Sequence, residues 1–255
     1  MLKEERRKII LEQLSKIGII RISDLADELE ATEMTLRRDL KYLEEEGLLI
    51  RIHGGAKVKE SNKFEELSAN QKRCINSEDK IEIAKIAASL IEENDIVYIG
   101  PGTTNEYIYD YIDISYAKII TNCLLIFDKF KDDNRFEVIL IGGRLRKKTS
   151  TFVGSLTNEA LLKLKVKTAF FGANGVYNNN IMTSNEDEGM SQRVILDNAM
   201  RKYLVCDSSK IEKEDFYTLY NLENVTALLT NKNLNKSLKI KYSKYCKIID
   251  AIKED

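Results

Sequence analysis

Apolar residues recur at helical spacing near the start of the chain. Ile10, Leu14 and Ile17 fall on one face of a first helix, and Gly18 suits its C-terminal stop. After a short apolar bridge, Ser23 is expected to cap a second helix with the sequence DLADELE. The pattern therefore predicts two short helices joined by a tight connection.

A third amphipathic helix follows, and its polar face carries the first candidate chemistry. Leu36, Leu40 and Leu43 form its buried stripe, Thr32 suits its N-cap, and Gly47 ends it. The side chains left on the outer face are Glu33, Thr35, Arg37, Arg38 and Lys41. Three short helices with tight turns are typical of a helix-turn-helix unit.

The run LLIRIHGGAKV predicts a β-hairpin, or wing, over residues 47–59, because two isoleucines alternate there with an arginine and a histidine. The bend falls on Gly54 and Gly55, where glycine tolerates the tight turn. No acid accompanies the basic residues of this segment, which are Arg51, Lys57 and Lys59.

This arrangement predicts a DNA-binding surface. In a helix-turn-helix unit the third helix enters the major groove, where arginine binds guanine or a phosphate, and a wing can lie along the DNA backbone. The predicted DNA-binding residues are Thr32, Glu33, Thr35, Arg37, Arg38, Lys41, Arg51, His53, Gly54 and Gly55. The alternative is a solvated helix face, because residues 1–59 hold 12 basic and 12 acidic side chains.

From residue 79 onward, apolar strands alternate with helices. DIVYIG precedes PGTTNEYIYDYI, and KIITN precedes CLLIFDKF. Such alternation predicts an α/β Rossmann-like domain with a largely parallel sheet covered on both faces. We therefore expect an α+β winged helix-turn-helix domain over residues 1–58, a polar linker over 59–78 and an α/β sensor domain over 79–255.

Ligands bind beyond the carboxyl ends of the strands in such a sheet, so the residues that follow each strand are informative. Glycine, hydroxyl, amide and charged side chains recur after five of the expected strands. The candidate effector-binding residues are Gly100, Gly102, Thr103, Thr104, Thr121, Asn122, Gly142, Gly143, Arg144, Gly172, Asn174, Asp187, Glu188, Asp207 and Lys210.

That set suits a small anionic molecule with hydroxyl groups. The glycines of GPGTT let backbone N–H groups face inward at an expected helix N-terminus, where the dipole favours phosphate. Lys210 supplies a counter-charge, and Asn122 and Asp207 can bond sugar hydroxyls. A dinucleotide site fits less well, because Asn105 stands where a third glycine is expected, and no GKT or GKS marks a P-loop. A plain strand-to-helix turn is the alternative for GPGTT.

Composition excludes several protein classes. The chain has 255 residues, 32% of them charged, with a net charge of -1, which describes a globular protein of two domains. No signal peptide is visible, and no apolar run approaches the ~18 residues of a membrane span. Cys74, Cys123, Cys206 and Cys246 lie far apart, so we expect reduced thiols in the cytoplasm. We assign no catalytic residue, metal or cofactor.

The first sixty residues resemble the N-terminal module of the DeoR family of bacterial transcriptional regulators. Arg6, Ile10 and Leu14 stand at the four-residue steps of that family's signature. The residues that match after the gap are Thr32, Thr35, Leu36, Arg37, Arg38, Asp39 and Leu40. The HGGA wing follows as it does in the family. Because Asp39 is acidic beside DNA, we expect it to pair with an arginine and hold its rotamer.

The rest of the chain also resembles this family, whose C-terminal sensor domain is related in fold to sugar-phosphate isomerases. The finer resemblance is to the lactose phosphotransferase-system repressor subgroup and covers nearly the whole chain. The matching runs, in order, are IGPGTT followed by Glu106, IITNCL, LIGG, FVG, IMTS with a nearby DE, and KEDF. The inducer in that subgroup is tagatose 6-phosphate, so the resemblance implies a phosphorylated ketohexose at the strand ends.

Together these observations predict a cytoplasmic repressor that binds double-stranded operator DNA as a homo-oligomer, a dimer or a tetramer, with no membrane partner. A phosphorylated sugar would release it. The rival is a sugar-phosphate isomerase-like enzyme with a DNA-binding module, in which Asp207 and Lys210 would act near Asp187 and Glu188. A weaker rival is a repressor that responds to another class of metabolite, such as a nucleotide.

Overall fold

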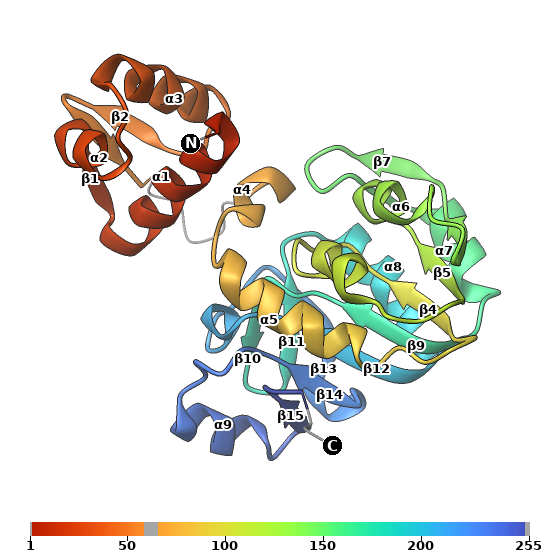
Figure 1. The fold of residues 1–255 in the computed structure, drawn as a ribbon. Coiled ribbons are helices and arrows are strands. Elements are labelled where there is room, and N and C mark those ends of the chain that lie inside the picture. Colours follow the sequence, from red (N-terminus) through yellow and green to blue (C-terminus); the bar gives the residue numbers. More distant parts are fainter. Residues whose placement is uncertain (1, 59–65, 253–255) are drawn as a thin grey trace. The chain divides into compact units, whose positions relative to one another are not determined.

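The computed structural model describes residues 2–58 and 66–252 of the chain. These residues belong to two compact units, with the boundary between Ser77 and Glu78 (Figure 1). Within the described ranges, no helix is both long enough and apolar enough to cross a membrane.

In the first unit, the first three helices accompany a small antiparallel sheet of order β1-β3-β2, and a short fourth helix follows in the sequence. The elements of this unit are α1 (Lys3–Ile17), β1 (Ile19–Arg21), α2 (Ile22–Glu28), α3 (Glu33–Glu45), β2 (Ile50–Ile52), β3 (Gly55–Lys57) and α4 (Ala69–Arg73). Leu36, Leu40 and Leu43 of α3 are buried, which confirms the predicted stripe. Ile17 was predicted to lie inward, but it is 70% exposed, because it is the last residue of α1, beyond the turn that reaches the core.

The two predicted helix caps differ in outcome. The backbone N–H of Thr35 donates to Thr32 Oγ1 at 3.3 Å, which confirms Thr32 as the N-cap of α3. The prediction for Ser23 is wrong, because α2 begins two residues earlier than expected, at Ile22, and Arg21 occupies the cap position. The apolar bridge before it pairs with the wing as β1, and that pairing carries the chain directly into α2.

Part of the expected linker is folded onto the first unit. Ser68 and Gln71 form a reciprocal capping box at the start of α4, and Gln71 Nε2 donates to the carbonyl oxygen of Gly47 at 2.5 Å. Ser77 Oγ donates to Glu12 Oε1 at 2.7 Å. Residues 59–65 of the expected linker lie outside the described residues, so its boundaries stay a prediction.

The second unit is built on a seven-stranded sheet whose strands run parallel. In spatial order the strands are β15 (Lys247–Ile249), β14 (Ala227–Leu229), β12 (Ala199–Val205), β9 (Val166–Phe171), β4 (Ile96–Ile99), β5 (Ala117–Thr121) and β6 (Phe136–Leu140). The α-helices of this part are α5 (Ser77–Ala88), α6 (Leu124–Phe130), α7 (Ser155–Leu162), α8 (Glu186–Asp197) and α9 (Lys236–Tyr242). The predicted α/β Rossmann-like class is confirmed.

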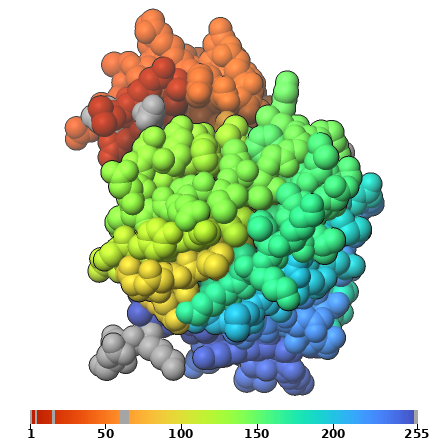
Figure 2. Space-filling view, turned by 90° about the vertical axis from the view of Figure 1, so that its right-hand side faces the viewer, coloured from red at the N-terminus to blue at the C-terminus, as the bar shows by residue number. Residues whose placement is uncertain are grey.

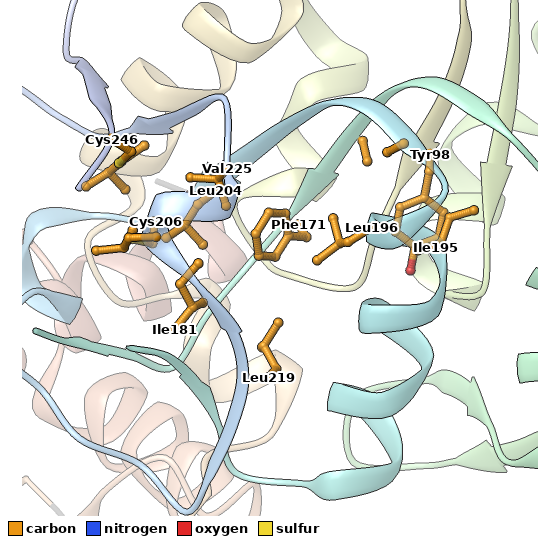
Figure 3. Packing of buried hydrophobic residues seen from close by; sticks show 14 of the residues in the cluster. Tyr98, Phe171, Ile181, Ile195, Leu196, Leu204, Cys206, Leu219, Val225 and Cys246 are labelled. Atoms are coloured by element: carbon orange, nitrogen blue, oxygen red, sulfur yellow. The ribbon is translucent and has the colours of Figure 1, made fainter. Parts of the chain in front are cut away.

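Alternate side chains of the central strands enter two separate hydrophobic clusters. In β4, Tyr98 joins one cluster, whereas Val97 and Ile99 join the other. Phe170 and Phe171 of β9 divide in the same way. Figure 3 shows the cluster that holds Tyr98 and Phe171. Successive residues point to opposite faces of a strand, so the continuous apolar runs in the sequence reflect a sheet that is buried on both sides.

Several local elements of this unit differ from the expectation. The segment after GPGTT forms a 3-10 helix, η1 (Asn105–Tyr111), rather than an α-helix. A β-hairpin of β7 (Arg144–Arg146) and β8 (Thr151–Val153) separates β6 from α7, within the green segment visible at the surface in Figure 2. The remaining elements are β10 (Gly175–Tyr177), β11 (Asn180–Thr183) and β13 (Tyr217–Asn221), which form a separate antiparallel sheet, with η2 (Ser208–Lys210) and η3 (Leu222–Asn224).

An ion-pair network ties the amino ends of three strands together. Asp95, just before β4, is buried, and its two oxygens lie 2.6 Å from Lys167 Nζ and 3.0 Å from Arg201 Nη2. Glu92 is exposed and contacts the same two cations, at 2.6 Å and 2.7 Å. Lys167 lies on β9 and Arg201 on β12, so the network joins β4 to its neighbour β9 and to β12, the next strand beyond it.

This network predicts a pH-dependent contribution to stability. Hydrogen bonds from Lys167 and then Arg201 lower the pKa of Glu92 from 4.5 to about 2. Because the pKa in the folded state is the lower one, the contribution is present above pH 4.5 and is lost as the pH falls toward about 2. The difference in thermal unfolding temperature between wild type and Glu92→Gln should therefore shrink over that window. A difference that stays constant, or that Glu93→Gln reproduces, would contradict this assignment.

Candidate DNA-binding surface and effector site

The outer face of α3 presents two adjacent arginines in different settings. Arg37 Nη2 donates to Glu33 Oε2 at 3.1 Å, one turn earlier, and both side chains are exposed. Lys41 lies 3.8 Å from Glu45. Arg38 is also exposed, and no carboxylate in the described part of the chain pairs with it. Arg38 is therefore the guanidinium of this face that is most available to a ligand.

The start of α3 holds a small group of side chains suited to base edges. The hydroxyl oxygens of Thr32 and Thr35 lie 2.9 Å apart, and Met34 between them is exposed. Hydroxyls can bond base edges, and an apolar side chain can contact a thymine methyl group. The sequence pattern does not single out Met34, because an apolar residue in an amphipathic helix is ordinarily predicted to be core.

Asp39 anchors α3 to α1 and is 2% exposed. Its two carboxylate oxygens accept hydrogen bonds from Arg6 Nε at 2.6 Å and Arg7 Nε at 2.8 Å. The expected pairing with an arginine is confirmed, and both partners come from α1. The Arg7 guanidinium carbon also lies 3.6 Å from the centre of the Tyr42 ring, a cation–π contact. These contacts fix the rotation of α3, and with it the direction of its outer face.

Replacing Asp39 with asparagine should destabilise the first unit by about 3 kcal/mol, the lower end for breaking a buried ion pair. An amide can accept from one arginine, but its NH₂ group then faces the other guanidinium. Calorimetric unfolding of the full chain measures the change, and Asp27→Asn, at an exposed site on α2, is the control. Equal unfolding of the two variants would contradict the anchoring role.

The wing is a hairpin with a two-residue turn at His53 and Gly54. The observed turn therefore lies one residue before the predicted one at Gly54 and Gly55. Gly54 has a φ of +78°, in the left-handed region that favours glycine. A Cβ on Gly55 would lie 2.0 Å from the carbonyl oxygen of Ile20, so only glycine lets β3 pair with β1. Lys59, predicted as part of the wing, lies outside the described residues.

A groove of 280 Å³ separates α3 from the wing. Its lining residues are Ile22, Arg37, Leu40, Glu44, Arg51, Ile52, His53, Gly54 and Gly55. The predicted residues Arg37, Arg51 and His53 thus face one groove from two elements. A DNA backbone lying along such a groove would meet cations from both of its walls.

In the second unit, the candidate effector residues gather at the carboxyl edge of the parallel sheet. The order of strands reverses between β4 and β9, which makes the loops after these two strands the switch point of the fold. A Cβ on Gly172 would lie 3.8 Å from the Cα of Gly102, so the two loops touch there. Gly102 has a φ of +151°, which favours glycine.

The GPGTT loop is held by a residue that the sequence did not single out for binding. Asn105 Nδ2 donates to the carbonyl oxygen of Gly100 at 2.9 Å, and the residue is fully buried. Its Oδ1 has no hydrogen-bond partner in the described part of the chain. Thr103 and Thr104 beside it are also buried. The loop therefore offers an unused acceptor and two hydroxyls next to the switch point.

The side chain of Asn122 is engaged within the protein. Its Oδ1 accepts from Tyr98 Oη at 2.8 Å, and its Nδ2 donates to the carbonyl oxygen of Phe152 at 2.8 Å. Thr121 Oγ1 accepts from the backbone N–H of Cys123 at 3.0 Å. Thr121 and Asn122 both lie at the predicted edge of the sheet, but the hydrogen bonds named here use their polar atoms to hold the loops in place. Their predicted contact with an effector stays a prediction.

The β7–β8 hairpin is linked to α8 by two arginine–carboxylate pairs. Arg144 Nη2 pairs with Asp187 Oδ2, and Arg146 Nη1 donates to Glu188 Oε1 at 3.1 Å. A Cβ on Gly143, just before the hairpin, would lie 2.0 Å from Thr157 Oγ1. The predicted residues Arg144, Asp187 and Glu188 therefore lie close together. Their ion pairs are formed between the hairpin and α8. The Oγ1 of Thr157 donates to the carbonyl oxygen of Gly142 at 2.9 Å.

The loop after β12 contributes charge to the same edge. Asp207 is buried and accepts from the backbone N–H of Ser209 at 3.0 Å, while Lys210 is half-buried. Lys213, which the sequence pattern did not single out, follows in the same segment, and its pKa lies below the usual range, because desolvation and the charge of Lys210 outweigh the opposite effect of Asp207. Asn174, after β9, donates from Nδ2 to Ser184 Oγ at 2.8 Å.

No group of three or more histidine, cysteine, aspartate and glutamate side chains in residues 2–58 and 66–252 is placed to hold a metal ion. Cys74, Cys123, Cys206 and Cys246 are all free thiols. The arrangement at the sheet edge instead offers backbone and hydroxyl donors, two lysines and an unused amide oxygen. These groups suit an anion with hydroxyls.

Both units match known domain families. Residues 6–62 match the DeoR-like helix-turn-helix domain, and residues 75–232 match the DeoR C terminal sensor domain. Together the two matches cover most of the chain, and the second alone spans more than half of it.

Curated relatives match over nearly their whole length. A Streptococcus mutans protein named lactose phosphotransferase system repressor is 42% identical over 252 residues, which cover 98% of this chain and 100% of the relative. Relatives of the same name from Staphylococcus epidermidis and Staphylococcus aureus are 40% and 39% identical, covering 94% and 90% of this chain and 97% and 92% of those proteins.

Solved structures match more distantly. Ribose 5-phosphate isomerase A from Methanocaldococcus jannaschii aligns with a TM-score of 0.38 and 16% identity, over 55% of this chain and 56% of that one. The eIF2B beta structure from Chaetomium thermophilum aligns with a TM-score of 0.44 and 16% identity, over 69% and 55% of the two chains. Matches this weak carry no argument about function.

Proposed function

This chain belongs to the DeoR family of transcriptional regulators, and from that premise we propose that it represses lactose-utilisation genes until a phosphorylated sugar binds. The observation that carries the proposal is the presence of two candidate sites in one chain. In the first unit, α3 exposes Arg38 and shares a groove with the glycine-bent wing through Arg37. The second unit has a glycine-rich sheet edge with Lys210. The relatives named lactose phosphotransferase system repressor support the choice of genes.

DNA binding follows from the first unit. The start of α3 enters the major groove, with Arg38 on guanine and Thr35 and Met34 on neighbouring base edges. Arg51 and Lys57 of the wing contact phosphates. Each phosphate contact releases counterions, so operator affinity falls steeply as salt rises. A protein with this role acts in the cytoplasm, where the DNA is.

Effector binding follows from the second unit. A phosphate accepts hydrogen bonds from backbone N–H groups of the GPGTT loop and pairs with Lys210, while Thr103 and Asp207 bond sugar hydroxyls. Tagatose 6-phosphate is the ketohexose phosphate that we propose. To release DNA, it must bind more tightly to the form that does not bind the operator. In a homo-oligomer, that form spaces the paired α3 helices wrongly for two half-sites.

The rival activity, sugar-phosphate isomerisation, needs a carboxylate that can act as a general base. Asp187 and Glu188 are each held in an ion pair with an arginine of the β7–β8 hairpin, which occupies the carboxylate oxygens that a base would use. Asp207 accepts a hydrogen bond from the backbone N–H of Ser209. We therefore propose no turnover by this chain.

A duplex selection followed by a release assay tests the proposal. The full chain should enrich one operator sequence from a random duplex library, and tagatose 6-phosphate should lower its affinity for that operator. The same sugar phosphate incubated with the protein should be recovered unchanged. A protein that enriches no sequence, or that interconverts ketose and aldose phosphates, contradicts the proposal.

A further inference from the structure

An acidic side chain faces the groove between α3 and the wing, where DNA is proposed to lie. Glu44, in the last turn of α3, lines the groove of 280 Å³ together with Arg51. Its Oε1 accepts from the backbone N–H of Arg51 at 3.0 Å, and its Oε2 accepts from Arg51 Nε at 2.8 Å. Both side chains are partly exposed, so this pair is not needed to fill the core.

We propose that Glu44 is a positioning residue, which holds β2 and the Arg51 guanidinium in the orientation that meets a DNA phosphate, so that an acidic residue strengthens DNA binding. The inference rests on the proposed function of the first unit as an operator-binding module. It assigns to Glu44 a part that neither the sequence pattern nor the charge of the residue indicates.

The two hydrogen bonds act on different parts of the wing. The bond to the backbone N–H fixes the start of β2 against the end of α3. The bond to Nε fixes the plane of the guanidinium and leaves its terminal NH₂ groups, which carry four further donors, for a phosphate. Hydrogen bonds from the Arg51 side chain and then its backbone lower the pKa of Glu44, so the carboxylate stays charged at neutral pH.

Simple electrostatics gives the opposite expectation, which makes the inference testable. A carboxylate beside DNA repels the phosphates, so its removal should tighten binding. Glu45, the next residue of α3, is the matched control. It lies 3.8 Å from Lys41 on the same helix, and both of those side chains are exposed. Replacing Glu44 or Glu45 with glutamine removes the same charge from neighbouring positions.

The experiment measures operator affinity of the full chain for wild type, Glu44→Gln, Glu45→Gln, Arg51→Ala and the double variant Glu44→Gln/Arg51→Ala. Glutamine is isosteric with glutamate, but its NH₂ group would face one of the two Arg51 donors. We expect Glu45→Gln to bind as tightly as wild type or tighter. Glu44→Gln should bind about two- to fivefold more weakly, the range for loss of an exposed ion pair.

Two further readouts separate positioning from a general structural effect. In the Arg51→Ala background, Glu44→Gln should cause no further loss, because the side chain that it positions is gone. The slope of log affinity against log salt should fall in magnitude by about 1 in Glu44→Gln, as in Arg51→Ala, because one phosphate contact is lost. Glu45→Gln should leave that slope unchanged.

The inference is overturned if Glu44→Gln binds as tightly as Glu45→Gln, or if its loss persists in the Arg51→Ala background. In either case wild type and Glu45→Gln would still bind the operator, so the proposed function would stand. If wild type itself enriches no operator, the proposed function fails, and the positioning role of Glu44 fails with it.

Discussion

Replacing Arg38 with alanine should weaken operator binding roughly 5- to 150-fold, the effect of losing about 1–3 kcal/mol from one bidentate contact with guanine. Arg38 is exposed on the outer face of α3 and, among the described residues, forms no ion pair. Its removal therefore breaks no ion pair within the described part of the chain. Titration of labelled operator with the full chain measures the loss.

The conservative variant separates base recognition from charge. Arg38→Lys keeps the positive charge but not the planar fork, so we expect it to bind random duplex DNA as wild type does and to lose preference for the operator. The response of the sensor unit to sugar phosphate should be unchanged in both variants. If Arg38→Ala keeps full operator affinity, α3 does not read DNA through this residue.

Replacing Lys210 with alanine should leave operator binding intact and weaken release by sugar phosphate roughly 10- to 150-fold. That range corresponds to about 1.5–3 kcal/mol for a hydrogen bond to a charged group. Lys210 is half-buried at the carboxyl edge of the sheet, in the loop that starts with the buried Asp207. The concentration of tagatose 6-phosphate that releases half of the operator is the quantity to measure.

Lys165→Ala is the matched control, because it removes a lysine from an exposed position between α7 and β9. It should respond to the effector as wild type does. An unchanged response in Lys210→Ala would show that the anion binds elsewhere. Loss of operator binding in Lys210→Ala would show that the residue supports the fold rather than the effector.

Local sequence patterns predicted the structure correctly where a single helix face or a single cap determined it. The spacing of Leu36, Leu40 and Leu43 placed the core face of α3, and Thr32 caps it as predicted. Ser23 failed as a cap because β1 pairs with the wing, a contact between distant segments that no local pattern reports. For the same reason the sequence did not predict that both partners of Asp39 come from α1.

The sequence predicted where the candidate effector residues lie, but not the hydrogen-bond partners of their side chains. Glycine-rich strand ends were expected along one edge of a parallel sheet, and the loops of Gly102 and Gly172 meet at that edge. The partners of Asn122, by contrast, come from Tyr98 and Phe152, and only the folded chain reveals that both ends of its amide are used. Lys213 was missed because a lysine in a polar loop has no distinctive spacing.

The most direct test of a DNA-reading unit controlled by an anion at the sheet edge is one titration. A preformed complex of the full chain with its selected operator is titrated with tagatose 6-phosphate, with unphosphorylated tagatose and with inorganic phosphate, while the anisotropy of the DNA is followed. We predict that tagatose 6-phosphate dissociates the complex at concentrations where the sugar alone and phosphate alone do not. A complex that tagatose 6-phosphate leaves intact, or that all three compounds affect equally, would contradict the account.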